Sequence, residues 1–175
     1  LATMMGNYYS GISVAADSFL TDLHNKINPH SFIYYGDYEN TILSLFESRD
    51  TSGGQKIVTC VYSGYNFIYS EPFNWSVMSR EHTYCHTWMP TYPADSPEKP
   101  EYNDQHHLFP AQFTNANQVR LNYPLGEVVT ITSQFLDCKF GKDIYGRNVF
   151  EPRDEHKGNA ARALMYMAVC YNGVN

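Results

Sequence analysis

The sequence predicts a single α+β domain in which strands occupy the middle of the chain and helices lie towards its two ends. The longer helical patterns lie in residues 17–48 and 159–171, and the β-branched and alternating segments lie between them. No βαβ alternation runs along the chain, which disfavours a parallel doubly wound sheet. With 175 residues, 43% of them apolar and 17% charged, the chain can bury one core. We therefore expect one domain over residues 1–175.

Two helices are expected in the first third of the chain, over residues 17–27 and 38–48. Asp17 is a candidate N-cap for the first, and apolar side chains recur on one face of each. The side chains expected to face inward are Phe19, Leu20, Leu23 and Ile27 in the first helix and Ile42, Leu45 and Phe46 in the second. A turn at residues 50–54 leads to a strand over 56–62, with 66–70 as its pairing partner.

Prolines punctuate the middle of the chain. Residues 89–102 contain Pro90, Pro93, Pro97 and Pro100, a density that excludes helix and internal strand. We expect an exposed loop there. A short helix should follow, capped by Thr114 or Asn115 and running through Arg120.

The C-terminal third predicts strands and then the best helix of the chain. Residues 128–135 and 148–150 are strand-like, with a turn over 141–146. Residues 159–171 show the strongest helical pattern, and Asn172-Gly173 suits its end. Its apolar face would consist of Ala160, Ala163, Leu164, Met167 and Ala168.

The charge, the hydropathy and the cysteines of the chain disfavour several classes of protein. The net charge of -6 argues mildly against a large basic nucleic-acid-binding face, although a bound cation and a few arginines can make one cleft positive. No apolar run could span a bilayer, so no membrane partner is expected. None of the four cysteines forms a CxxC pair, which disfavours a zinc knuckle. Cys60 and Cys170 should be buried thiols, whereas Cys85 and Cys138 are a candidate disulfide pair.

Three segments carry side chains suited to metal-assisted hydrolysis: Ser79-Arg80-Glu81-His82, residues 104–111 and residues 117–124. Glu81 and Asn117 offer the oxygen ligands that Mg²⁺ and Ca²⁺ prefer, and these ions need few protein ligands because they retain water. The imidazole of His82 is matched to taking a proton from water near neutral pH. No glycine-rich phosphate loop follows a strand, so nucleotide binding of that kind is unsupported.

In order and spacing these segments resemble the endonuclease I family of His-Me finger (ββα-metal) nucleases. The likeness extends to residues 62–64, 122–128 and 150–163, and more loosely to the N-terminal part. It implies a His-Me finger core in which Glu81 and Asn117 hold Mg²⁺, with Mn²⁺ or Ca²⁺ as alternatives, and His82 is the general base. Because neighbouring residues on an ideal strand face opposite sides, we expect the Glu81-His82 pair at an irregular strand end.

The resemblance also implies supporting roles. Arg120, one helical turn from Asn117, would stabilise the developing charge. Residues expected to bind substrate or to support the site are Arg80, His106, His107, Glu127 and Arg162. The chain departs from the family pattern after the histidine: residues 83–88 intervene before Met89-Pro90, where members commonly place a proline two or three residues on. We therefore expect a differently shaped loop beside the site.

The function expected is a metal-dependent, sequence-non-specific endonuclease acting on DNA, with RNA as a further substrate, and leaving 5′-phosphates. The resemblance implies a secreted or periplasmic monomer whose signal peptide lies outside this chain. Two alternatives stay open: a phosphodiesterase with another substrate, and a catalytically silent secreted domain that binds nucleic acid. A zinc peptidase is disfavoured, because His82 and His86 lack the H-E-x-x-H pattern and a strong helix signal.

Overall fold

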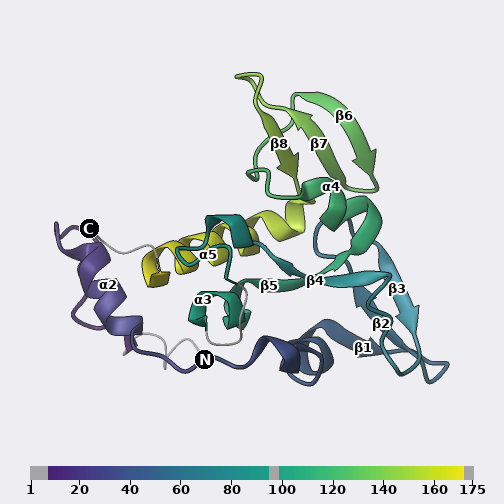
Figure 1. Cartoon of the computed structure of the whole chain (residues 1–175), viewed down its shortest axis with the longest axis horizontal. Helices are drawn as coiled ribbons and strands as arrows, with labels where there is room; N and C mark the ends of the chain where they lie inside the picture. Colours follow the sequence, from purple (N-terminus) through teal and green to yellow (C-terminus); the bar gives the residue numbers. More distant parts are fainter. Residues whose placement is uncertain (1–7, 95–98, 172–175) are drawn as a thin grey trace.

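The computed structural model describes residues 8–94 and 99–171 and combines helices with small antiparallel sheets in one domain (Figure 1). The strands are β1 (Ser48–Asp50), β2 (Lys56–Thr59), β3 (Asn66–Tyr69), β4 (Met78–His82), β5 (Leu108–Gln112), β6 (Thr130–Phe135), β7 (Cys138–Lys142) and β8 (Asn148–Glu151). The helices are α2 (Phe19–Ile27), α3 (Pro100–Asn103), α4 (Gln118–Arg120) and α5 (Asp154–Tyr171). In the described residues β1–β2–β3, β4–β5 and β6–β7–β8 form separate antiparallel sheets, which confirms the α+β class.

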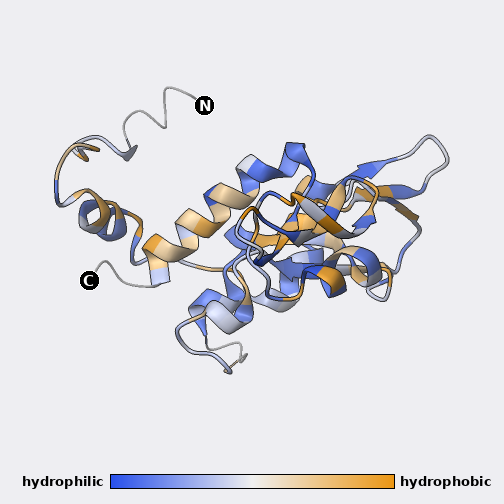
Figure 2. Cartoon of the chain, turned by 90° about the horizontal axis from the view of Figure 1, so that it is seen from above, coloured by the Kyte–Doolittle hydropathy of each residue, from blue (hydrophilic) through white to orange (hydrophobic). Residues whose placement is uncertain are grey.

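The main core surrounds the β4–β5 hairpin. Its buried side chains come from all three sheets and include Val58, Tyr62, Met78, Leu108 and Phe150. The hairpin joins the first sheet through a hydrogen bond from the Val61 amide to the Pro110 carbonyl. Helix α5 runs beside the hairpin and carries one of the apolar stretches that Figure 2 shows in orange. The hairpin is therefore held on several sides, which suits a segment expected to carry the site.

The predicted helix over residues 38–48 is wrong. A 3₁₀ turn (Tyr35–Glu39) and a π-helical turn (Leu43–Glu47) replace it, and Ser48 already begins β1. Because a π turn rotates successive side chains differently from an α-helix, the 3.6-residue pattern selects the wrong face. Leu45 and Phe46 are 69% and 74% exposed, whereas Leu43 is buried.

The helix predicted over residues 17–27 forms from Phe19, after Ser18 rather than a capping Asp17. None of its side chains is fully buried, and the element it packs against most is the far end of α5 (Figure 1). Helix α5 begins at Asp154, five residues earlier than predicted, and Ala168 is exposed. The expected stop at Asn172-Gly173 lies outside the described residues.

The strand pair β2–β3 and strands β6 and β8 confirm the predictions for those segments, but β7 was missed. Gly141 suggested a turn, yet it lies within β7 opposite β6. A Cβ atom there would lie 2.0 Å from the Thr130 carbonyl oxygen, so the glycine permits close strand approach. The turn itself is tighter, with Gly146 in the left-handed region at φ 75°.

The proline-rich segment is not simply an exposed loop. Pro100 opens the short helix α3, because proline is tolerated in the first turn of a helix. Glu101 and Asn103 are buried. Residues 95–98 lie outside the described part.

All four cysteines are buried free thiols, as expected for Cys60 and Cys170. The candidate pair of Cys85 and Cys138 does not form. The Cys85 thiol contacts Arg120, and the Cys138 thiol donates to the Phe135 carbonyl oxygen.

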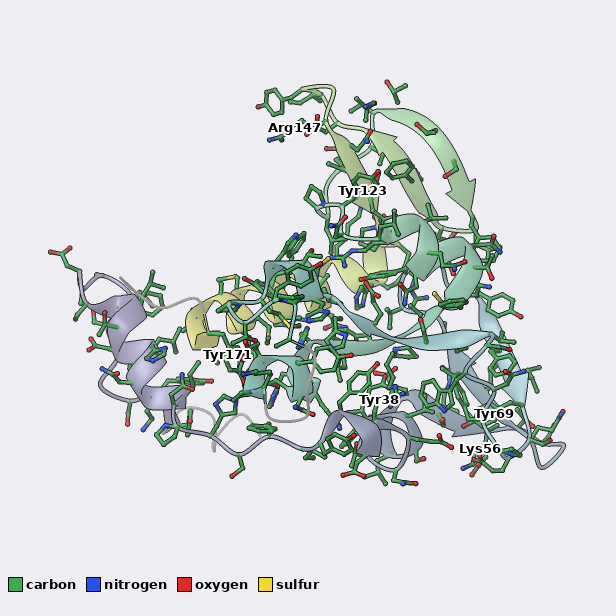
Figure 3. The ribbon with its side chains drawn as sticks, viewed as in Figure 1. Tyr38, Lys56, Tyr69, Tyr123, Arg147 and Tyr171 are labelled. Atoms are coloured by element: carbon green, nitrogen blue, oxygen red, sulfur yellow. The ribbon has the colours of Figure 1, made fainter. Side chains whose placement is uncertain are left out.

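Asp104 ties three distant parts of the chain together. Its Oδ2 accepts hydrogen bonds from His30 (3.0 Å), Tyr166 (2.9 Å) and Tyr171 (2.7 Å), and its Oδ1 accepts from the backbone and ring of His106. Tyr171 lies at the C-terminal end of α5 (Figure 3). Burial opposes the Asp104 charge, but hydrogen bonds from His106 and Tyr171 outweigh it and hold the Asp104 pKa well below its usual range.

We expect Asp104→Asn to lower the free energy of unfolding by about 3 kcal/mol at pH 7, because the buried carboxylate anchors several donors. Because the pKa of Asp104 is lower in the folded than in the unfolded protein, its carboxylate contributes fully to folding stability above the unfolded value near pH 4. This contribution is lost progressively as the pH falls further. Urea unfolding at pH 7 and pH 3 should therefore show the difference shrinking in acid. Glu155→Gln, at an exposed carboxylate, is the control; an equal effect of the two substitutions would contradict the prediction.

Candidate functional site

The candidate site is built on β4, β5 and the helical turns that follow. Glu81 pairs with Phe109 and His82 with Leu108, so the motif lies in the hairpin with its register unbroken. His82 is the last residue of β4, as expected for a strand end, but the register shows no irregularity. After β5 the chain passes through a π-helical turn (Phe113–Asn117) into α4 and returns beside β4. The Gln112 side chain caps this turn at the Asn115 amide, in place of the expected Thr114 or Asn115.

One cavity of about 440 Å³ brings most of the expected residues together. Its lining consists of Arg80, Glu81, His82, Cys85, His86, Thr87, Asn117, Arg120, Leu121 and Asn122. Every residue assigned to metal binding or to proton transfer from water is among them. The cavity lies where β4 meets α4, and this volume suits a small group such as a phosphodiester.

Glu81 is 4% exposed and is held by two donors. Its Oε1 accepts from the Tyr62 hydroxyl at 3.0 Å and from Arg120 Nη1 at 3.1 Å. Burial raises the Glu81 pKa to about 7, against the opposing effects of Arg120 and Tyr62. Oε2 has no hydrogen-bond partner in the described residues, so one carboxylate oxygen is left to the cavity.

Asn117 is oriented by Ser79. The Asn117 amide nitrogen donates to Ser79 Oγ at 2.5 Å, and the Ser79 hydroxyl donates to the Ala111 carbonyl at 3.1 Å. This chain of bonds leaves the Asn117 Oδ1 as an acceptor. A carboxylate oxygen and an amide oxygen at one cavity are the donor set that fits a hard divalent cation retaining water. No cluster of three or more His, Cys, Asp or Glu side chains able to hold a metal occurs in residues 8–94 and 99–171.

His82 is fixed by the backbone acceptor that a general base requires. Its Nε2 donates to the Tyr102 carbonyl oxygen at 2.9 Å, so the lone pair resides on Nδ1. The imidazole stacks on the Tyr35 ring, with centroids 5.2 Å apart and planes 10° apart. Burial lowers the His82 pKa to about 4, so the ring is neutral near neutral pH.

Arg120 does not occupy the position expected of a phosphate-binding group. Its side chain is only 1% exposed, and it donates to Glu81 and to the carbonyl oxygens of Thr83 (2.7 Å), His82 and Leu121. A guanidinium occupied in this way orients the Glu81 carboxylate. The helical spacing placed Arg120 at the cavity correctly but could not show how many protein acceptors surround it.

Arg80 has guanidinium N–H groups that are not used in hydrogen bonds among the described residues and could donate to a ligand in the cavity. Its guanidinium lies over the rings of Tyr35 (4.2 Å) and Trp75 (4.8 Å), and Nη1 donates to the Tyr35 carbonyl at 3.2 Å. It forms no ion pair with a carboxylate in the described residues. Aromatic stacking orients a guanidinium without occupying its N–H groups. Apart from Arg120, the other arginines of the described residues lie outside the cavity lining; Arg147, for example, projects near the β7–β8 turn and pairs with Asp143 (Figure 3).

Four expected site residues lie outside the cavity lining. His107 is fully buried and donates to the Glu101 carbonyl, with its ring 5.1 Å from that of His82, so it packs behind the base. His106 bonds Asp104. Glu127 is exposed and holds no arginine in the described residues, and Arg162 is exposed and donates to Asn159. Both residues therefore lie away from the cavity, and beside Glu127 it is Glu151 that accepts hydrogen bonds from Lys157 and the Val128 amide.

Sequence reasoning missed several residues that shape the site. Tyr35 and Trp75 lie outside every motif, and only the folded chain brings them to Arg80. His86 was considered only as a possible zinc ligand, because a histidine four residues after His82 would lie on the same face of a helix. It does not lie on an α-helix with His82 but on a separate 3₁₀ turn (His86–Trp88).

Glu81, His82 and Asn117 thus line one cavity beside the β4–β5 hairpin and the helical turns that follow it. Residues 15–174 match the model of the Endonuclease I family, and the chain belongs to this family of nucleases. It is similar to an extracellular ribonuclease of Bacillus subtilis (strain 168), with 28% identity over 168 residues. That match covers 95% of this chain and 54% of the relative, so the chain spans about half of the relative's length. No solved structure matches.

Proposed function

We propose that this protein is a metal-dependent, sequence-non-specific endonuclease that hydrolyses phosphodiester bonds in DNA or RNA and leaves 5′-phosphates. The observation that carries the proposal is the convergence of Glu81, His82, Asn117 and Arg80 on one cavity, each held by its own partner. Membership of a nuclease family supports hydrolysis of nucleic acid. RNA is included because the Bacillus relative is named a ribonuclease.

In this proposal each residue of the cavity has a separate role in the hydrolysis. His82 Nδ1 takes a proton from the attacking water, and Arg80 donates to non-bridging phosphate oxygens. Glu81 Oε2 and Asn117 Oδ1 would hold Mg²⁺, with Mn²⁺ or Ca²⁺ as alternatives. When bound there, such a cation would supply neutralisation of the charge that develops on the phosphate and the departing oxygen. Arg120 and Tyr62 keep the Glu81 carboxylate in place.

Cleavage of a plasmid and of an RNA oligonucleotide tests the proposal. We expect degradation with Mg²⁺, none with EDTA, and products whose 5′ ends carry phosphate. Absence of cleavage with Mg²⁺, Mn²⁺ or Ca²⁺ from pH 6 to 9 would contradict it. Binding of nucleic acid without cleavage would then indicate a silent binding domain.

We infer that the protein acts outside the cytoplasm as a monomer. The relative named extracellular supports this location, and no helix in the described residues is long and apolar enough to cross a membrane. Fractionation of the producing cells and light scattering of the purified protein test the two statements; a cytoplasmic pool or a stable dimer would contradict them.

Arg80→Ala is expected to lower kcat/KM about 10²-fold, mainly through KM, because a stacked guanidinium that binds phosphate is lost. Arg80→Lys should recover only part of this activity, since lysine lacks the planar fork. Binding measured against salt concentration should show a slope reduced by about 1. Arg162→Ala, outside the cavity, is the control. An unchanged KM and salt slope in the Arg80 variant would contradict the assignment.

A further inference from the structure

We propose that His86 is the general acid that protonates the departing 3′ oxygen. This inference rests on the proposed function and adds a second proton-transfer residue to it. His86 lines the same cavity as Glu81, His82 and Asn117. It was not expected from the motif, and it lies on the segment where the chain departs from the family pattern.

His86 is anchored in the same manner as His82. Its Nε2 donates to the Ala94 carbonyl oxygen at 3.1 Å, as His82 Nε2 does to the Tyr102 carbonyl. Its ring packs edge-on against Tyr92 (5.1 Å, 76°) and Tyr102 (5.0 Å, 70°). Each imidazole therefore has one nitrogen bound to a backbone carbonyl, and Nδ1 without a partner in the described residues.

The two histidines are placed around one tyrosine. The Tyr102 ring lies 4.6 Å from the His82 ring and 5.0 Å from the His86 ring, so the two imidazoles, which both line the cavity, flank one tyrosine ring. Attack on phosphorus needs a base at the entering oxygen and an acid at the leaving oxygen. Arg120 cannot serve as that acid, because guanidinium keeps its protons and these N–H groups bind protein acceptors.

The proton transfers balance. His82 Nδ1 accepts a proton from water as the new O–P bond forms. The bond between phosphorus and the 3′ oxygen breaks, and its electron pair goes to that oxygen. Protonated His86 gives the Nδ1 proton to the oxygen, which leaves as a hydroxyl group, while Nε2 remains bonded to the Ala94 carbonyl. Exchange of protons with solvent then restores both imidazoles to the forms in which they began the cycle.

A leaving-group substitution tests this role. Two oligonucleotides are compared, one with ordinary phosphodiesters and one whose single cleavable linkage has sulfur in place of the 3′ oxygen. A thiolate leaves without a proton, because thiols have a pKa of about 8.5, far below that of an alcohol. The variant is His86→Gln. The control is His24→Gln, because His24 also bonds a backbone carbonyl, that of Val169, but lies outside the cavity lining.

We expect His86→Gln to lose about 10²-fold in kcat on the ordinary linkage and to lie within about threefold of wild type on the sulfur linkage. His24→Gln should match wild type on both. Activity on the sulfur linkage also shows that the variant is folded. An equal loss on both linkages, or no loss on the ordinary one, would overturn the role of His86. Failure of the wild-type protein to cleave either linkage would instead overturn the proposed nuclease function.

Discussion

Glu81→Gln is expected to lower kcat/KM by about 10³-fold, equivalent to ~4 kcal/mol of transition-state stabilisation. The substitution keeps the shape of the side chain but removes the charge that a divalent cation requires. It also leaves the buried guanidinium of Arg120 without its carboxylate partner, which should cost about 3 kcal/mol of folding stability. Kinetics and urea unfolding measure the two effects separately.

Thermal unfolding with and without Mg²⁺ provides a readout that does not depend on turnover. A cation that binds only the folded protein raises its stability, by ~2.7 kcal/mol at one hundred times the dissociation constant. Wild-type protein should show this rise in Tm, and Glu81→Gln should not. Glu127→Gln, at an exposed carboxylate outside the cavity, should behave as wild type. A Glu81 variant that still gains stability from Mg²⁺ would show that the cation is held elsewhere.

The candidate site could be predicted from sequence to the extent that it is local. Arg80, Glu81 and His82 are consecutive, and the hairpin returns the chain so that Asn117 lies beside β4 through its bond to Ser79. Such contacts follow from a motif once a hairpin is assumed. The support of His82 and Arg80 by Tyr35 does not, because Tyr35 lies more than forty residues upstream in a 3₁₀ turn that has no helical or strand periodicity.

The errors in the predicted fold also arise where the structure depends on contacts between residues that are distant in the sequence or on irregular backbone. Side-chain periodicity reports α-helix and strand well, as β2, β3 and α5 show, but not the π-helical turn at Leu43–Glu47. Gly141 was interpreted as a turn because a sequence cannot show that a neighbouring carbonyl lies where its Cβ would be. The role of Arg120 also depends on burial, which decides whether a guanidinium faces substrate or protein.

His82→Ala is expected to lower kcat by about 10³-fold while leaving the Mg²⁺-dependent rise in Tm unchanged. The alanine removes the base but neither of the two oxygen ligands assigned to the cation. The His82 ring lies between aromatic neighbours, against Tyr35 and Tyr102, so its removal leaves a slot of imidazole shape. Imidazole added at millimolar concentration should therefore restore part of the lost rate.

This combination separates a base from a structural histidine. A histidine that only packs against Tyr35 would, when removed, lower Tm and the rate together, and added imidazole would restore neither in proportion to its concentration. His24→Ala, which removes another carbonyl-bound imidazole outside the cavity, should leave the rate unchanged and insensitive to imidazole. If His82→Ala keeps the wild-type rate, another group accepts the proton of water. Because Glu81 and His82 are adjacent on one strand yet differ in these two readouts, the pair of variants assigns cation binding and proton transfer to different side chains.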